Sequence, residues 1–191
     1  MSTGRLIGID LGTTFSSVAY VDATGHVVCL PNREGQTLTP SAVWLNDAGT
    51  LEVGAPARAA LTTHPDRVAV AFKRRMGKLD EPFKLGDRLF DAAELSAAVL
   101  RRLVEDAEHA LGPIAGAVIT VPAYFWDRER SATLRAAEQA GIRVLDILNE
   151  PTAAALAYAF DAYIQAGGDP GDVATASIAA TAPAISVVCD L

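Results

Sequence analysis

Short apolar runs predict the strands of this chain. Most of these runs are rich in valine and isoleucine and are bounded by glycine, proline, asparagine or aspartate, as expected for buried strands between turns. Residues 22–25 (DATG) predict a hairpin turn, so the chain opens as an antiparallel meander. The predicted strands cover residues 6–10, 15–21, 26–30, 41–45, 51–53, 83–85, 89–90, 117–121, 142–148 and 184–190.

Longer segments with apolar residues on one face predict helices. The clearest segment follows Asp91, because Asp91 and Glu94 have the spacing of a capping box. Apolar residues then recur every four positions as far as Leu111, and Gly112 and Pro113 end the pattern. Further helices are predicted at residues 55–63, 68–75, 127–140 and 152–165.

The order of these elements predicts an α/β fold. Two strand–helix units that follow a meander indicate a mixed five-stranded sheet with flanking helices. Residues 1–39 and 112–166 are interpreted as the core, and residues 40–111 as a small inserted α+β subdomain with its connecting helix. Residues 167–183 are small and alanine-rich, like a linker. Residues 184–191 predict a strand that ends abruptly, so we interpret the chain as truncated.

Composition and charge narrow the class of protein. The 191 residues suffice for one core with a small insertion, and half of them are apolar. The net charge of −7 argues against nucleic acid as a partner, because an acidic surface repels phosphate backbones. Such a charge does not exclude ATP, since backbone dipoles and Mg²⁺ can bind an anion locally.

Location is predicted from the missing membrane signals and from the cysteines. No apolar run reaches the ~18 residues of a membrane span, and residues 1–5 are too short and polar for a signal peptide. Cys29 and Cys189 lie in apolar, strand-like runs and are predicted to be buried, reduced thiols. Together these features predict a cytoplasmic protein.

Candidate chemistry begins at the end of the first predicted strand, in residues 10–14 (DLGTT). Gly12 allows a tight turn whose backbone N–H groups can face a phosphate, and the hydroxyls of Thr13 and Thr14 add donors. The carboxylate of Asp10 can hold Mg²⁺, often through water. The alternative is a β-turn with a capping aspartate.

Three further positions carry candidate groups. Glu150 stands between a strand and a helix, where ligands of open α/β sheets gather, although it could simply complement the helix dipole. Lys73 could reach a terminal phosphate as a point charge, but composition alone favours a solvated basic helix end. Pro122 fixes the backbone at a strand exit and Arg130 follows in the next helix; the alternative is a rigid turn and a surface arginine.

Taken in order, these segments resemble the DnaK-type (heat shock protein 70) family. The resemblance covers most of residues 4–160 and is carried by residues 8–16 (GIDLGTTFS), 121–125 (VPAYF) and 149–158 (NEPTAAALAY). It implies an RNase-H-like lobe of the actin-like ATPase superfamily. It also implies an ATP-driven protein-folding chaperone that hydrolyses ATP to ADP and phosphate with Mg²⁺.

The resemblance also implies roles for single residues. Asp10 would organise Mg²⁺ and the attacking water, Lys73 would stabilise charge on the terminal phosphate, and Glu150 would act near the metal-bound waters. The phosphates would contact Gly12, Thr13 and Thr14. Pro122 and Arg130 resemble a switch proline and a relay arginine. Asp190 resembles the acid at the start of the family's second phosphate loop, which belongs to a second lobe, and it would lie near the metal.

Partners of the full-length protein follow from the same resemblance. It implies unfolded polypeptides, a J-domain co-chaperone and a nucleotide exchange factor as partners of the full-length protein, with this chain inactive alone. Phe15 stands where many members of the family have tyrosine.

The rival functions are a sugar or carboxylate kinase of the same superfamily, a filament-forming actin-like protein, and a pseudo-ATPase that keeps only the fold.

Overall fold

A computed structural model describes residues 4–168 of the chain. The predicted strand at 184–190, with Cys189 and Asp190, lies outside the described residues, as does nearly all of the predicted linker.

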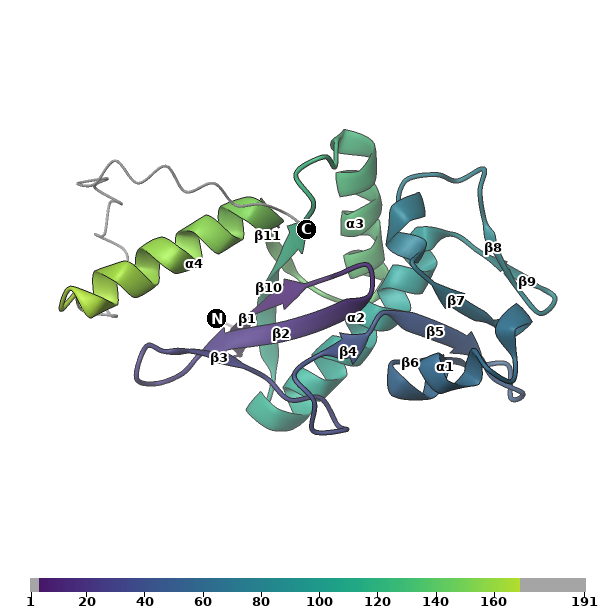
Figure 1. The fold of residues 1–191 in the computed structure, drawn as a ribbon, viewed down its shortest axis with the longest axis horizontal. Helices are drawn as coiled ribbons and strands as arrows, with labels where there is room; N and C mark the ends of the chain where they lie inside the picture. Colours follow the sequence, from purple (N-terminus) through teal and green to yellow (C-terminus); the bar gives the residue numbers. More distant parts are fainter. Residues whose placement is uncertain (1–3, 169–191) are drawn as a thin grey trace.

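A mixed sheet forms the centre of the described chain (Figure 1). Its strands follow the order β11-β10-β1-β2-β3, and the short β4 pairs with β2. β1 runs parallel to β10, and β10 parallel to β11, whereas β1, β2 and β3 are antiparallel neighbours. The predicted mixed sheet is therefore confirmed, with β4 as an additional strand. The strands are β1 (Arg5–Asp10), β2 (Phe15–Val21), β3 (Val27–Cys29), β4 (Thr39–Pro40), β10 (Ile114–Val121) and β11 (Val144–Asn149).

Three long helices flank this sheet: α2 (Ala92–Leu111), α3 (Asp127–Gln139) and α4 (Glu150–Gln165). In Figure 1, α2 and α3 lie together on one side of the sheet and α4 lies on the other. The predicted capping box is present, since Asp91 Oδ1 accepts from the Glu94 N–H and the Asp91 N–H donates to Glu94 Oε2, both at 2.8 Å. Buried aliphatic side chains from α2, β1 and β10 share one core, which holds these elements in place.

The insertion follows β4 and carries its own small sheet. β5 (Ala42–Leu45) pairs with both β6 (Leu51–Val53) and β7 (Val68–Val70), and β8 (Phe83–Leu85) pairs with β9 (Arg88–Phe90). The other elements are the helix α1 (Ala55–Ala60) and two 3₁₀ helices, η1 (Pro65–Arg67) and η2 (Phe72–Arg75).

Two sequence predictions are wrong, one in the insertion and one in the central sheet. The predicted helix at 68–75 is instead strand β7 followed by η2, because Val68–Val70 pair with β5 and Ala71 then adopts a left-handed backbone, with φ 53°. Cys29 is exposed rather than buried, since β3 lies at the outer edge of the sheet. None of the described helices is long and apolar enough to cross a membrane.

An ion-pair network joins α2 to the segment that follows β3. Asp106 of α2, whose side chain is 5% exposed, accepts from Arg33 Nε at 2.7 Å and from Arg102 Nε at 3.0 Å. Arg102 also donates to the carbonyl of Val53 at 3.3 Å and so reaches β6 of the insertion. Burial lowers the pKa of Arg33, but its hydrogen bonds and opposite charges raise that pKa overall above its usual value.

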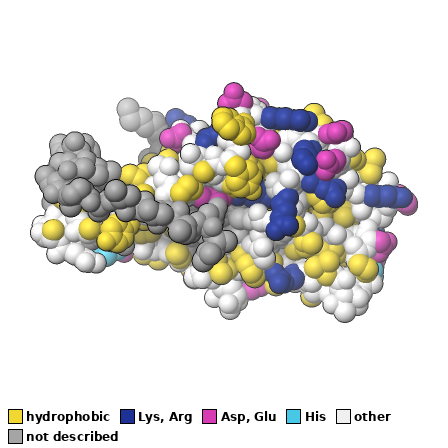
Figure 2. All heavy atoms as spheres, turned by 45° about the horizontal axis from the view of Figure 1, so that its top comes forward, with side chains coloured by type: hydrophobic (Ala, Val, Ile, Leu, Met, Phe, Trp, Pro, Cys, Tyr) yellow, Lys and Arg dark blue, Asp and Glu magenta, His cyan; other side chains and the backbone are white. Residues whose placement is uncertain are grey.

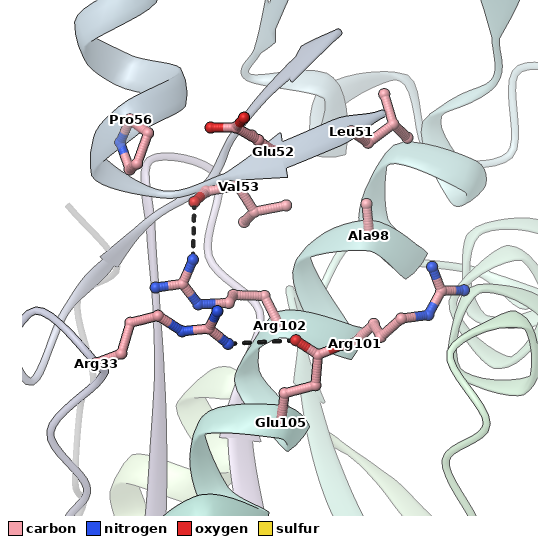
Figure 3. A pocket seen from close by; sticks show the side chains of 9 residues that line it. All are labelled: Arg33, Leu51, Glu52, Val53, Pro56, Ala98, Arg101, Arg102 and Glu105. Carbon is pink, nitrogen blue, oxygen red and sulfur yellow. Dashed lines mark hydrogen bonds and ion pairs between the residues drawn. The ribbon is translucent and has the colours of Figure 1, made fainter. Parts of the chain in front are cut away.

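This network borders a pocket of about 310 Å³ between α2, β6 and α1 (Figure 3). Two of its lining residues form an ion pair, Arg33 Nη2 with Glu105 Oε2 at 3.2 Å. Because Arg33 and Arg102 are both held by carboxylates of the same network, we interpret the pocket as a junction between the insertion and the core. The pocket is lined by Arg33, Leu51, Glu52, Val53, Pro56, Ala98, Arg101, Arg102 and Glu105.

Candidate functional site

The carboxyl ends of three neighbouring strands meet at one edge of the central sheet. In the parallel register, Asp10 of β1 lies beside Thr120 of β10, and Val121 lies beside Asn149 of β11. Glu150 directly follows Asn149 and begins α4. Asp10 and Glu150 therefore lie at the same edge of the sheet.

Asp10 is oriented by its neighbour on β10. The hydroxyl of Thr120 donates to Asp10 Oδ1 at 2.9 Å. Asp10 itself is exposed, and within residues 4–168 no group donates a hydrogen bond to its Oδ2. One carboxylate oxygen is thus held by the protein, while the other is open to a ligand or to water.

The loop after β1 has the backbone geometry that a phosphate site needs. A Cβ atom on Gly12 would lie 2.0 Å from the carbonyl oxygen of Phe15, so a side chain does not fit at Gly12. The backbone N–H groups of Thr13 and Thr14 donate to no acceptor among the described residues. These two N–H groups and their hydroxyls form a set of donors at the end of a strand.

Lys73 reaches the same edge from the insertion. Its ammonium group pairs with Glu150 Oε1 at 2.7 Å and lies 5.7 Å from the centre of the Phe125 ring. The Lys73 side chain is only 4% exposed, so the alternative of a solvated basic helix end is wrong. The pair links η2 of the insertion to the start of α4 in the core.

The turn between β10 and α3 is held by Arg130. The guanidinium donates to the carbonyls of Phe125 at 3.3 Å and Ile147 at 3.4 Å, and also to the side-chain oxygen of Asn149. Pro122 is buried at the strand exit, and its carbonyl accepts from the Phe125 N–H at 3.0 Å. Arg130 is therefore not a free surface arginine, because it ties this turn to the end of β11.

Comparison with known proteins identifies the family. The family model described as "Hsp70 protein" matches residues 6–85 and 81–168 of the chain. The chain belongs to the Hsp70 family. It is 46% identical over 157 residues to proteins called "Chaperone protein DnaK" from Thermotoga neapolitana, Thermotoga petrophila and Thermotoga maritima. The matched region covers 82% of the chain and 26% of each relative, so the chain spans about a quarter of their length.

Membership of the Hsp70 family does not favour the rival readings as a sugar or carboxylate kinase or as a filament-forming protein. The matched residues contain the whole edge described above, from Asp10 to Glu150.

Sequence reasoning assigned no role to three residues of this candidate site. Thr120 and Asn149 were polar residues at predicted strand ends, and Asn149 and Phe125 stood in motifs that carry the resemblance without a role of their own. The position of Thr120 and Asn149 at predicted strand ends was the available signal, but their partners depend on strand register. The predicted role of Asp190 concerns a residue outside the described part of the chain.

Proposed function

We propose that residues 4–168 are the phosphate-binding half of the ATPase domain of a DnaK-type chaperone, with an RNase-H-like core. The observation that carries this proposal is the pair between the buried Lys73 ammonium and the partly exposed Glu150, at the sheet edge that also presents Asp10. A buried ammonium beside a carboxylate-bearing strand edge suits phosphoryl transfer, which depends on positioning and charge stabilisation. The proposed activity of the whole protein is hydrolysis of ATP to ADP and phosphate.

Each residue has a proposed role in that reaction. The N–H groups and hydroxyls of Thr13 and Thr14 bind phosphate oxygens, and Gly12 allows the close backbone approach. Lys73 stabilises negative charge on the terminal phosphate, and Glu150 holds its ammonium in place. Asp10, oriented by Thr120, accepts hydrogen bonds from the attacking water.

The residues present suit Mg²⁺ bound largely through water. Within residues 4–168, no group of three or more histidine, cysteine or acidic side chains could cage a metal ion. Mg²⁺ prefers to keep several waters and to bind through one or two carboxylates plus substrate phosphates, and Asp10 is the carboxylate at this edge. When bound, Mg²⁺ would neutralise charge on the phosphates; Asp190 is proposed as an additional acid near it.

Local charge also supports an anionic ligand on a chain whose net charge is −7. In the view of Figure 2, most of the visible Lys and Arg side chains lie on the half of the molecule that carries the insertion, with Asp and Glu side chains among them. Arg74 and Arg75 are exposed next to the buried Lys73, and Arg75 pairs with Glu81 at 3.7 Å. A local positive potential of this kind raises the concentration of an anion near its site.

The remaining proposals concern the whole protein. Pro122 and Arg130 are proposed to relay the nucleotide state to further domains, since Arg130 already bridges the turn after β10 and the end of β11. Unfolded polypeptides, a J-domain co-chaperone and a nucleotide exchange factor are the proposed partners. We keep the division into a core at 1–39 and 112–166, an insertion at 40–111, a linker at 167–183 and a second-lobe strand at 184–191 as a proposal. A cytoplasmic location likewise stays a prediction.

We propose a two-lobe reading, in which ATP lies in a cleft between two lobes and this chain supplies one wall. Titration of this 191-residue chain with Mg-ATP in a calorimeter tests it. Phosphates in an open half-site stay hydrated and each contact is screened, so we expect a Kd on the order of millimolar or weaker, without measurable hydrolysis. The intact protein that carries this segment should bind Mg-ATP far more tightly and hydrolyse it. Micromolar binding by this chain alone would contradict the two-lobe reading, and an intact protein that does not bind Mg-ATP would contradict the proposed function.

Replacement of Gly12 tests the loop. In the intact protein, Gly12→Ala should weaken Mg-nucleotide binding by about tenfold or more, because the new Cβ would lie 2.0 Å from the Phe15 carbonyl and the loop must shift. Gly8→Ala is the matched control on β1, since the atom nearest to its Cβ would be 3.9 Å away. Equal affinities for the two variants would show that the loop does not contact the nucleotide.

A further inference from the structure

Two buried serines close a ring of hydrogen bonds on the phosphate-facing loop. The Gly12 N–H donates to Ser16 Oγ at 3.2 Å, and Ser41 Oγ donates to the Gly12 carbonyl at 2.8 Å. The two hydroxyl oxygens lie 2.9 Å apart. The N–H and the carbonyl of Gly12 are therefore both bound by the same pair of side chains.

The direction of every hydrogen bond in this ring follows from the number of protons. A serine hydroxyl has one hydrogen, and Ser41 uses its hydrogen on the Gly12 carbonyl. In the contact between the two serines, Ser41 must therefore accept and Ser16 must donate. Ser16 Oγ in turn accepts from the Gly12 N–H, so each group in the ring donates once and accepts once. Bonds arranged head to tail in this way strengthen one another.

The ring is buried and joins three separate segments. Ser16 and Ser41 are 1% and 3% exposed, so water does not readily replace either hydroxyl. Ser16 belongs to β2, Gly12 to the loop after β1, and Ser41 stands between β4 and β5, where the chain enters the insertion. The Ser41 N–H also donates to the Thr14 carbonyl at 2.9 Å. The loop is thus fixed on both sides of Thr13 by the start of the insertion that carries Lys73.

We propose that Ser16 and Ser41 are positioning residues for nucleotide phosphates. By holding the N–H and the carbonyl of Gly12, they preset the direction of the N–H groups of Thr13 and Thr14, which have no acceptor within residues 4–168. Donors that are already oriented bind a phosphate without the cost of ordering a mobile loop. This inference rests on the proposed ATPase function and adds two residues that do not themselves touch the ligand.

The test measures Mg-ADP and Mg-ATP affinity in the intact protein, together with the urea midpoint of unfolding. Ser16→Ala and Ser41→Ala should each weaken nucleotide binding about tenfold, because each removes one hydrogen bond that orients the loop. The double variant should also lose about tenfold rather than a hundredfold, because either substitution alone opens the ring. Ser41→Thr retains the hydroxyl and should keep most of the affinity.

Ser96→Ala is the matched control, because Ser96 is also fully buried and donates to a backbone carbonyl, that of Ala92 at 2.7 Å, within α2. It should lower the urea midpoint and leave nucleotide affinity unchanged. If the two loop variants behave like Ser96→Ala, the serines are structural only and the proposal is wrong. Losses that multiply in the double variant would contradict the closed ring. Failure of the unsubstituted protein to bind nucleotide would instead refute the ATPase function itself.

Discussion

Replacement of Lys73 by alanine in the intact protein is expected to slow ATP hydrolysis by about two to three orders of magnitude. The physical reason is the loss of a preorganised positive charge that is 4% exposed and therefore little screened by water. Nucleotide binding should change much less, because the proposed phosphate contacts of Thr13 and Thr14 remain. Single-turnover hydrolysis of Mg-ATP, measured beside equilibrium binding, separates the two effects.

Lys78→Ala is the control for this substitution. Lys78 follows the same 3₁₀ helix, but it is half exposed and pairs with the equally exposed Glu81, so its removal should leave the rate nearly unchanged. If Lys73→Ala turned over ATP as fast as Lys78→Ala, Lys73 would have only a structural part in its pair with Glu150. A protein that lost nucleotide binding together with hydrolysis would point to collapse of the site.

Replacement of Asp106 by alanine should lower the free energy of unfolding more than replacement of its neighbour Glu105. This carboxylate accepts from Arg33 and Arg102, and the Arg102 side chain is only 11% exposed. Removal of the Asp106 carboxylate leaves Arg102 with Glu34, at 2.6 Å, as its remaining carboxylate partner, and such a loss typically costs about 1–3 kcal/mol in the free energy of unfolding. Urea denaturation followed by circular dichroism measures the change.

Glu105→Ala provides the comparison on the neighbouring position of α2. Glu105 pairs with the same Arg33, but its side chain is 53% exposed, so its loss should change the free energy of unfolding by less than about 1 kcal/mol. A second test combines Asp106→Ala with Arg102→Ala, which should cost less than the sum of the two single changes because they break one network. Equal effects of Asp106→Ala and Glu105→Ala would mean that the network does not stabilise the junction between the insertion and the core.

Local patterns in the sequence predicted most of the regular elements. The capping box at Asp91 and Glu94 and the four-residue apolar repeat after it describe helix α2 almost to the residue. Such signals are reliable because the partners lie within one or two helical turns. The strand ends at Asp10 and before Glu150 were likewise visible as apolar runs that stop at an acid.

Elements whose partners are distant in sequence could not be assigned in this way. Residues 68–70 were predicted as part of a helix, but they form a strand because β5 offers its edge there. Cys29 was predicted to be buried because of its apolar neighbours, yet β3 closes one side of the sheet and leaves it exposed. Short apolar runs fit either structure, and the tertiary partner decides between them.

The sequence by itself determined which residues carry charge and hydroxyls at strand ends: Asp10, Thr13, Thr14 and Glu150. Only the tertiary structure decided that Lys73 is buried against Glu150, a residue 77 positions away in the chain. It also decided that Thr120 orients Asp10 and that Ser41 binds Gly12, since these contacts require the register of β10 and the return of the chain at β4. A side chain's chemistry is a local property, whereas its solvation and its hydrogen-bond partners depend on segments that meet only when the sheet has formed.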